Sequence, residues 1–246
     1  MKERITMIGL AGPTNSGKTT AAEKLSLRLG EERSVMVHFD DYDSYPEGSD
    51  ELKALLASGT VVNWEDPKLF DMARFHSDMQ KLSRGQAIEV QPRSRESIAA
   101  GVNSEILEPR EYTIVEGLFV LHDPRTLEIY DFRFYLDLPR NEMMKRRLTR
   151  KRGSDPWDQS EYIRNAMVDG TIANVEPQKV HAHVVLDGMK TTEELVETIA
   201  AHLKSPRLPL KPDPFITTPF AGGNLHIPGN PTALERAKEH IRLHHG

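Results

Sequence analysis

The residues from Gly12 to Thr19 carry the clearest chemistry in this sequence, because they fit the pattern G-x-x-x-x-G-K-[ST]. A loop of this kind binds the phosphates of a nucleotide. Gly12 and Gly17 allow close approaches that a side chain would block, so successive N–H groups can face an anion at the start of a helix. Lys18 is expected to reach the β- and γ-phosphates, and the Thr19 hydroxyl is expected to bind Mg²⁺.

The flanking sequence favours a phosphate-binding loop over the alternative, which is a glycine-rich turn with a surface lysine. Residues 5–10 form an apolar run typical of a buried strand, and residues 19–25 have the composition of a helix. A strand, the loop and a helix in this order are the context in which the motif binds phosphate. We therefore expect the nucleotide to contact Gly12, Thr14, Asn15, Ser16, Gly17, Lys18, Thr19 and Thr20.

Acidic residues follow two further apolar runs, 34–39 and 112–115, which we interpret as strands. Asp40 and Asp41 follow the first run, and Glu116 ends the second. A carboxylate near a nucleotide can accept the proton of a substrate hydroxyl, a role for which we favour Asp40 over Asp41. Glu116 and Asp40 are, with Thr19, the candidate Mg²⁺ ligands. The alternatives are a turn or helix cap for the aspartates and a solvent-facing charge for Glu116.

These acidic residues can meet the loop only if their strands share one sheet. Apolar runs at 131–137 and 184–186, together with helical patterns such as 67–82, predict five strands alternating with helices. This order is typical of an α/β protein, a three-layer α/β/α P-loop NTPase fold with a mainly parallel five-stranded sheet. Ligands of such sheets bind beyond the carboxyl ends of the strands, where the loop, Asp40 and Glu116 all fall.

A basic run extends from Lys145 to Arg152. On a helix, Arg146 and Arg150 share one face, and Arg147 lies beside them. Arginines can stabilise the charge that phosphoryl transfer spreads over oxygen atoms, so these three are candidate phosphate contacts. The alternative interpretation is a solvated basic face of a helix.

Arg93 and Arg95 form a second, smaller basic group. These arginines are suited to bind an anionic part of a phosphoryl acceptor. An exposed hairpin between two strands is an equally good interpretation of the segment.

The composition limits the compartment and the partners that we expect. The 246-residue chain has a formal net charge of −5, no cysteine, and no apolar run near the ~20 residues that a membrane helix needs. Disulfides and thiolate metal sites are therefore excluded, and we expect a cytoplasmic protein without nucleic-acid or membrane partners. Because the first predicted strand begins almost at once, we expect no signal peptide.

Together, these motifs resemble the uridine kinase, phosphoribulokinase and pantothenate kinase group of phosphate-loop kinases, and the loop is also similar to that of nicotinamide riboside kinases. The resemblance covers about residues 4–203, and it depends on an ordered set of segments rather than on the loop alone. The similar segments are 12–20, the acidic–aromatic stretch 37–42, then 63–71, 85–88, 114–121 and the arginine-rich 146–150.

The resemblance implies a role for each matched position. Asp40 would be the catalytic base, with Lys18 and Arg147 as further catalytic residues, and Glu116 would lie on the Mg²⁺ side. The lid arginines near the phosphates would be Arg146, Arg147 and Arg150. The acceptor would contact Asp40, Asp41, Tyr42, Arg93 and Arg95.

One segment departs from the uridine kinase pattern. Those kinases carry Pro-x-Tyr-Asp after the glycine landmark, whereas residues 91–96 read Gln-Pro-Arg-Ser-Arg-Glu, which suits an acceptor with a negative group. We therefore predict an ATP- and Mg²⁺-dependent kinase that moves the γ-phosphoryl group to a hydroxyl of a small metabolite, with a nucleoside, a sugar phosphate or a vitamin as the acceptor. The alternative is a nucleotide-dependent regulatory or assembly NTPase without an acceptor, and a homo-oligomer remains open for both.

Two domain boundaries follow from these patterns. We expect a P-loop kinase domain over residues 1–203, including an arginine-rich lid near 140–170, and a proline-rich extension over 204–246. Thr191 and Glu194 match a capping box at the start of the last helix of the domain, which would run to Leu203.

Overall fold

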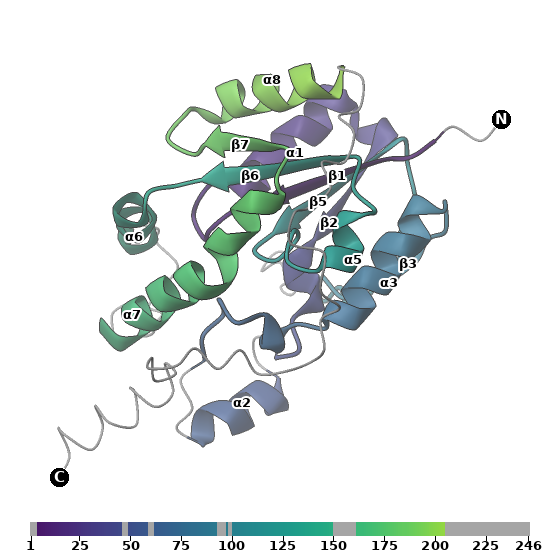
Figure 1. Ribbon diagram of the computed structural model, residues 1–246. Helices are drawn as coiled ribbons and strands as arrows, with labels where there is room; N and C mark the ends of the chain where they lie inside the picture. The colour runs from purple at the N-terminus through teal and green to yellow at the C-terminus, as the bar shows by residue number, and fades with distance from the viewer. Residues whose placement is uncertain are drawn as a thin grey trace, which may run out of the picture. The chain divides into compact units, whose positions relative to one another are not determined.

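The computed structural model describes residues 4–45, 49–58, 62–92, 97, 100–149 and 161–204. Its main feature is a five-stranded, all-parallel sheet with the strand order β2-β5-β1-β6-β7 (Figure 1). All five predicted strands are present. They are β1 (Thr6–Ala11), β2 (Ser34–His38), β5 (Tyr112–Gly117), β6 (Phe132–Asp137) and β7 (Val184–Asp187).

Helices cover both faces of this sheet, which confirms the predicted three-layer α/β/α arrangement (Figure 1). The α-helices are α1 (Lys18–Leu29), α2 (Asp50–Ala57), α3 (Met72–Ser83), α5 (Pro124–Leu127), α6 (Arg140–Thr149), α7 (Glu161–Gly170) and α8 (Thr192–Leu203). Short helical turns are η1 (Glu31–Arg33), η2 (Phe39–Tyr42), η3 (Pro67–Leu69), η5 (Thr171–Val175) and η6 (Glu176–His181). Within the described part of the chain, no helix is long and apolar enough to cross a membrane.

Alternate side chains of the central strands enter two separate hydrophobic cores. In β1, Ile8 and Leu10 pack against α1 and α8, whereas Met7 and Ala11 face the core on the other side. Both sets are almost fully buried, because a parallel sheet with helices on each face has no solvated side. The carboxyl ends of the strands are therefore the free edge at which polar side chains can gather.

An aromatic cluster fixes the turn that follows β2. Phe39 is fully buried, and its ring centroid lies 4.8 Å from that of Phe70 and 4.9 Å from that of Phe75. Phe119, just beyond β5, lies 5.7 Å from Phe39. These contacts hold η2, which carries Asp40, against the end of β5.

The predicted helix over 67–82 is wrong in its first part, because the chain leaves the helix at Phe70 and Asp71. Phe70 is extended and forms an isolated bridge with Asp43, and the Asp71 amide donates to the Tyr42 carbonyl. The Asp71 side chain then accepts from the Arg74 amide and caps α3. A polar cap and a tertiary contact therefore outweigh the apolar periodicity that favoured one continuous helix.

The remaining predictions concern segments outside the five-stranded sheet. A two-stranded antiparallel sheet, β3 (Ile88–Val90) with β4 (Glu105–Leu107), flanks the segment for which a hairpin between two strands was the alternative interpretation, but the bounds of these three-residue strands were not predicted. The predicted capping box of α8 is confirmed. Arg93, Arg95, Arg150 and the extension after Lys204 lie outside the described residues.

Candidate active site

The loop between β1 and α1 has the backbone geometry that a phosphate-binding loop requires. Gly17 lies in the left-handed region, with φ of 93°, at the N-cap of α1. Asn15 has φ of 59° and is the only non-glycine residue in the described part of the chain with a positive φ. A Cβ on Gly12 would lie 2.5 Å from the Leu136 carbonyl oxygen, so only glycine fits against β6 there. This backbone conformation suits a loop whose amides and the N-terminus of α1 face the same anion.

Two polar side chains inside the loop are buried in a way that suits an anion. Lys18 has only 8% of its surface exposed, and its ammonium donates to the Pro13 carbonyl at 2.9 Å. The Ser16 hydroxyl is buried and has no hydrogen-bond partner among the described residues. A buried cation and a buried hydroxyl next to a helix N-terminus form an environment that stabilises negative charge.

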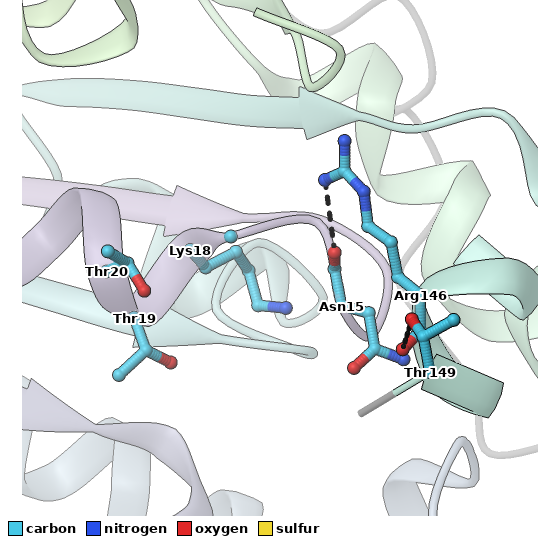
Figure 2. A pocket seen from close by; sticks show the side chains of 7 residues that line it. Asn15, Lys18, Thr19, Thr20, Arg146 and Thr149 are labelled. Atoms are coloured by element: carbon cyan, nitrogen blue, oxygen red, sulfur yellow. Dashed lines mark hydrogen bonds between the residues drawn. The ribbon is translucent and has the colours of Figure 1, made fainter. Parts of the chain in front are cut away.

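A cavity of about 390 Å³ lies above this loop (Figure 2). It is lined by Asn15, Gly17, Lys18, Thr19, Thr20, Arg146 and Thr149. The first five were predicted as nucleotide contacts from the motif, and Arg146 was predicted as a lid residue. Gly12, Thr14 and Ser16, also predicted, belong to the same loop but do not line the cavity.

Arg146 connects helix α6 to the loop across this cavity. Its guanidinium donates to the Asn15 carbonyl at 3.4 Å (Figure 2). It also donates to the Gly188 carbonyl at 3.1 Å and pairs with Glu142 at 3.1 Å. Arg146 is thus anchored to main-chain atoms of both the loop and the turn after β7. Thr149, on the same helix, completes this wall of the cavity and was not among the predicted site residues.

The predicted cation ligands Thr19 and Glu116 are brought into contact. The Thr19 hydroxyl donates to Glu116 Oε1 at 3.2 Å, although the two residues are far apart in the sequence. Glu116 is 5% exposed, and its Oε1 also lies 2.8 Å from His38 Nδ1. This hydrogen bond to Glu116 raises the pKa of His38. No sequence motif indicated the contact between His38 and Glu116, because it depends on the register of β2 with β5.

Gly117 explains how the ends of β2 and β5 come so close together. A Cβ at this position would lie 2.2 Å from Phe39 Cβ, and the backbone has φ of 155°. The absence of a side chain lets η2 pack directly on the end of β5. Asp40 is exposed on η2, whereas Asp41 is only 8% exposed.

Tyr42, predicted as an acceptor contact, lies in the hydrophobic core. It is 2% exposed, its ring packs at 5.1 Å from that of Phe75, and its hydroxyl donates to Asp78 at 3.3 Å. Burial raises the pKa of Tyr42 strongly. The role of Tyr42 in binding stays a prediction, and its visible contacts are with the core.

Glu65 is a candidate site residue that the sequence analysis assigned no role. It is 3% exposed, and its Oε2 has no hydrogen-bond partner among the described residues. Burial raises its pKa to about 7, and the charges of Lys18, Asp40 and Arg147 act on it. Three predicted catalytic residues from separate segments therefore act electrostatically on one buried carboxyl group. The resemblance of residues 63–71 to the kinase family was the sequence signal that could have pointed to Glu65. Only its burial in the folded protein shows that this carboxyl group is unusual.

The residues present fit a nucleotide with a divalent cation. Thr19 and Glu116 would hold the cation, and Lys18 and the loop amides would hold the phosphates. Within the described ranges, no three His, Asp or Glu side chains are grouped as a metal site, so the remaining ligands would come from phosphate and water. The cation would neutralise charge on the phosphate oxygens.

Known proteins resemble this chain over most of its length. Residues 7–194 match the model of the phosphoribulokinase/uridine kinase family. The uridine kinase of Clostridium perfringens (strain SM101) is 28% identical over 206 residues, which cover 82% of this chain and 96% of that protein. The phosphoribulokinase of Synechocystis is 29% identical over 209 residues, covering 84% of this chain and 60% of that protein.

The fold comparison agrees with the sequence comparisons. The structure of the phosphoribulokinase from Rhodobacter spheroides superimposes with a TM-score of 0.60 at 11% identity, covering 75% of this chain and 70% of that one. Uridine kinase-like protein 3 of Arabidopsis thaliana is 26% identical over 205 residues, but this chain spans only 42% of it. The chain belongs to the phosphoribulokinase/uridine kinase family of P-loop kinases.

Proposed function

We propose that this protein transfers the γ-phosphoryl group of ATP, with Mg²⁺, to a hydroxyl group of a small metabolite. The observation that carries the proposal is the contact between Thr19 and Glu116, directly after the buried Lys18 of the loop. It joins the end of the phosphate loop to an acidic strand end, which is the arrangement that a magnesium nucleotide requires.

Each residue of the site has a specific task in this proposal. Lys18 and the loop amides bind the phosphates and orient the γ-phosphorus. Arg147 offers a guanidinium to the oxygens of the transferred group. Asp40, exposed at the end of β2, accepts the proton of the attacking hydroxyl as the new P–O bond forms and the bond to the β-phosphate oxygen breaks.

The environment of Glu65 favours an acceptor with more than one hydroxyl group. Its buried Oε2 has no hydrogen-bond partner in the part of the chain that the structure describes, so a second hydroxyl of the acceptor can donate to it while the first faces Asp40. The charge of Asp40 acts on Glu65, which supports a shared acceptor pocket. A polyol such as a sugar, a sugar phosphate or a nucleoside ribose satisfies this chemistry.

The test is a panel of acceptors incubated with [γ-³²P]ATP and Mg²⁺, followed by chromatography of the products. The panel contains nucleosides, sugar phosphates, vitamin alcohols and, for each, the analogue that lacks one hydroxyl. We expect a labelled product with a polyol acceptor and a loss of labelling with its deoxy analogue. ATP hydrolysis that no acceptor stimulates, and that Asp40→Asn leaves unchanged, would contradict the proposal and favour a regulatory NTPase.

A further inference from the structure

His38 contacts Glu116, a candidate cation ligand, although the family resemblance assigned His38 no role. It is the last residue of β2, and it lies directly opposite Glu116 in the parallel pairing of β2 with β5. Register partners in neighbouring parallel strands direct their side chains to the same face of the sheet. The distance of 2.8 Å between His38 Nδ1 and Glu116 Oε1 follows from this register.

The carboxylate of Glu116 needs such a donor because it is buried. Its side chain is 7% exposed, whereas that of His38 is 39% exposed. A buried carboxylate keeps its charge and its orientation only when hydrogen-bond donors compensate for lost water. Thr19 and His38 both approach the same oxygen, Oε1, at 3.2 and 2.8 Å. The other carboxylate oxygen is thereby left for a different partner.

Thr19 and His38 differ in what else each side chain is expected to bind. The Thr19 hydroxyl can donate its hydrogen to Glu116 and offer an oxygen lone pair to a cation at the same time, so its position depends on both partners. His38 is placed opposite Glu116 by the register of β2 with β5, so its hydrogen bond to this carboxylate needs no cation. The imidazole is therefore a donor that can hold Glu116 both before and after the nucleotide arrives.

We propose that His38 is a positioning residue: its Nδ1–H donates to Glu116 Oε1 and fixes this carboxylate in the orientation that binds the divalent cation of the nucleotide. The inference rests on the proposed function, since it assumes that Glu116 faces the cation. It assigns to His38 no contact with substrate. Residues that orient metal ligands in this way change metal affinity by roughly 10- to 100-fold when they are replaced.

The test measures cation binding directly, with Mn²⁺ as an electron paramagnetic resonance probe in place of Mg²⁺. Free Mn²⁺ is titrated with the full-length protein and ADP, and nucleotide binding without metal is measured separately by calorimetry. Three substitutions are compared: His38→Ala, His38→Asn, whose amide nitrogen can replace Nδ1, and His202→Ala as a control on α8. His202 is also a histidine, and its Nδ1 contacts the Thr198 carbonyl, far from Glu116 in the chain.

We expect His38→Ala to weaken Mn²⁺–ADP binding by roughly 10- to 100-fold. Metal-free ADP binding should change by less than about twofold, because the loop amides are intact, and His38→Asn should recover most of the Mn²⁺ affinity. Adding Glu116→Gln to His38→Ala should weaken Mn²⁺ binding no further than Glu116→Gln alone, since His38 acts through Glu116.

Three results would overturn the assignment. Unchanged Mn²⁺ affinity in His38→Ala would show that Glu116 needs no positioning. Equal losses in the alanine and asparagine variants, with a lower melting temperature in both, would show that His38 only supports the fold. Fully additive effects of the His38 and Glu116 substitutions would show that the two act separately. Failure of the proposed function gives a different result: no acceptor in the panel would be phosphorylated, whereas the assignment of His38 is judged from Mn²⁺ affinity alone.

Discussion

The phosphate-binding side and the acceptor side of the site are built in different ways. The phosphate side is one continuous loop, Gly12 to Thr19, whose main-chain amides and buried Lys18 follow from a local motif. The proposed acceptor side is assembled from η2, which carries Asp40, and the segment around Glu65, and only the fold brings these two segments together. A loop that binds through its backbone can therefore be shared by many kinases, whereas a pocket of separate side chains can change with each acceptor.

The largest effect is expected on the phosphate side. Lys18→Ala removes the buried ammonium and should lower kcat/KM by at least about 10³-fold, because one group that stabilises transferred charge is lost. Steady-state kinetics with saturating acceptor measure the loss. The control is Lys24→Ala on the same helix α1, whose ammonium pairs with Glu193 at the surface and should leave kcat/KM within about twofold. An active Lys18→Ala protein would remove the basis of the phosphate-loop assignment.

A smaller but still large effect is expected for the proton acceptor. Asp40→Asn should lower kcat by roughly 10²- to 10⁴-fold and leave the KM for ATP within about threefold, since a general base acts on the hydroxyl and not on the nucleotide. Initial rates over a range of ATP concentrations separate the two parameters. Asp50→Asn, an exposed aspartate on α2, is the matched control. If Asp41→Asn instead caused the larger loss, the base would be Asp41.

The buried carboxyl of Glu65 predicts a stability that depends on pH. Its pKa is about 7 in the folded protein against an ordinary value of 4.5, so between these values the folded state holds a proton that the unfolded state has lost. The free energy of unfolding therefore falls as the pH rises from 4.5 to 7. The difference is on the order of 3 kcal/mol, because each pKa unit is worth about 1.4 kcal/mol.

Glu65→Gln tests this dependence, because glutamine has no proton to lose. Urea unfolding at a series of pH values should show the variant gaining stability over the wild type as the pH rises toward 8, with little difference near pH 4.5. Glu128→Gln, at an exposed carboxyl, is the matched control and should follow the wild-type curve. Parallel curves for Glu65→Gln and the wild type would mean that Glu65 does not retain its proton in the folded state.

The smallest effect is expected away from both sides of the site. Thr191→Ala removes the side-chain oxygen that accepts from the Glu194 amide and should lower the free energy of unfolding by about 1 kcal/mol without changing kcat. Thermal and urea unfolding measure the change. Thr198→Ala on the same helix, whose hydroxyl donates to the Glu194 carbonyl, is the comparison and should cost less. An equal loss of stability in the two variants would show that the Thr191 cap stabilises the helix no more than the Thr198 hydrogen bond does.

Sequence patterns predicted the central fold well because the strongest signals are local. The five parallel strands are short apolar runs, and the capping box at Thr191 needs only two residues at a fixed spacing. The single helix expected over 67–82 failed where a tertiary contact intervened. The Asp71 amide bonds to the Tyr42 carbonyl, which lies in a different segment and has no effect on local periodicity.

The sequence alone determined the phosphate loop, because backbone geometry, glycine spacing and one lysine are all encoded within a few neighbouring residues. Only the tertiary structure decided which side chains complete the site. The pairing of β2 with β5 placed His38 opposite Glu116, and burial left Glu65 Oε2 without a hydrogen-bond partner among the described residues. Strand register and desolvation arise from the whole fold, so neither can be derived from the spacing of residues along the chain.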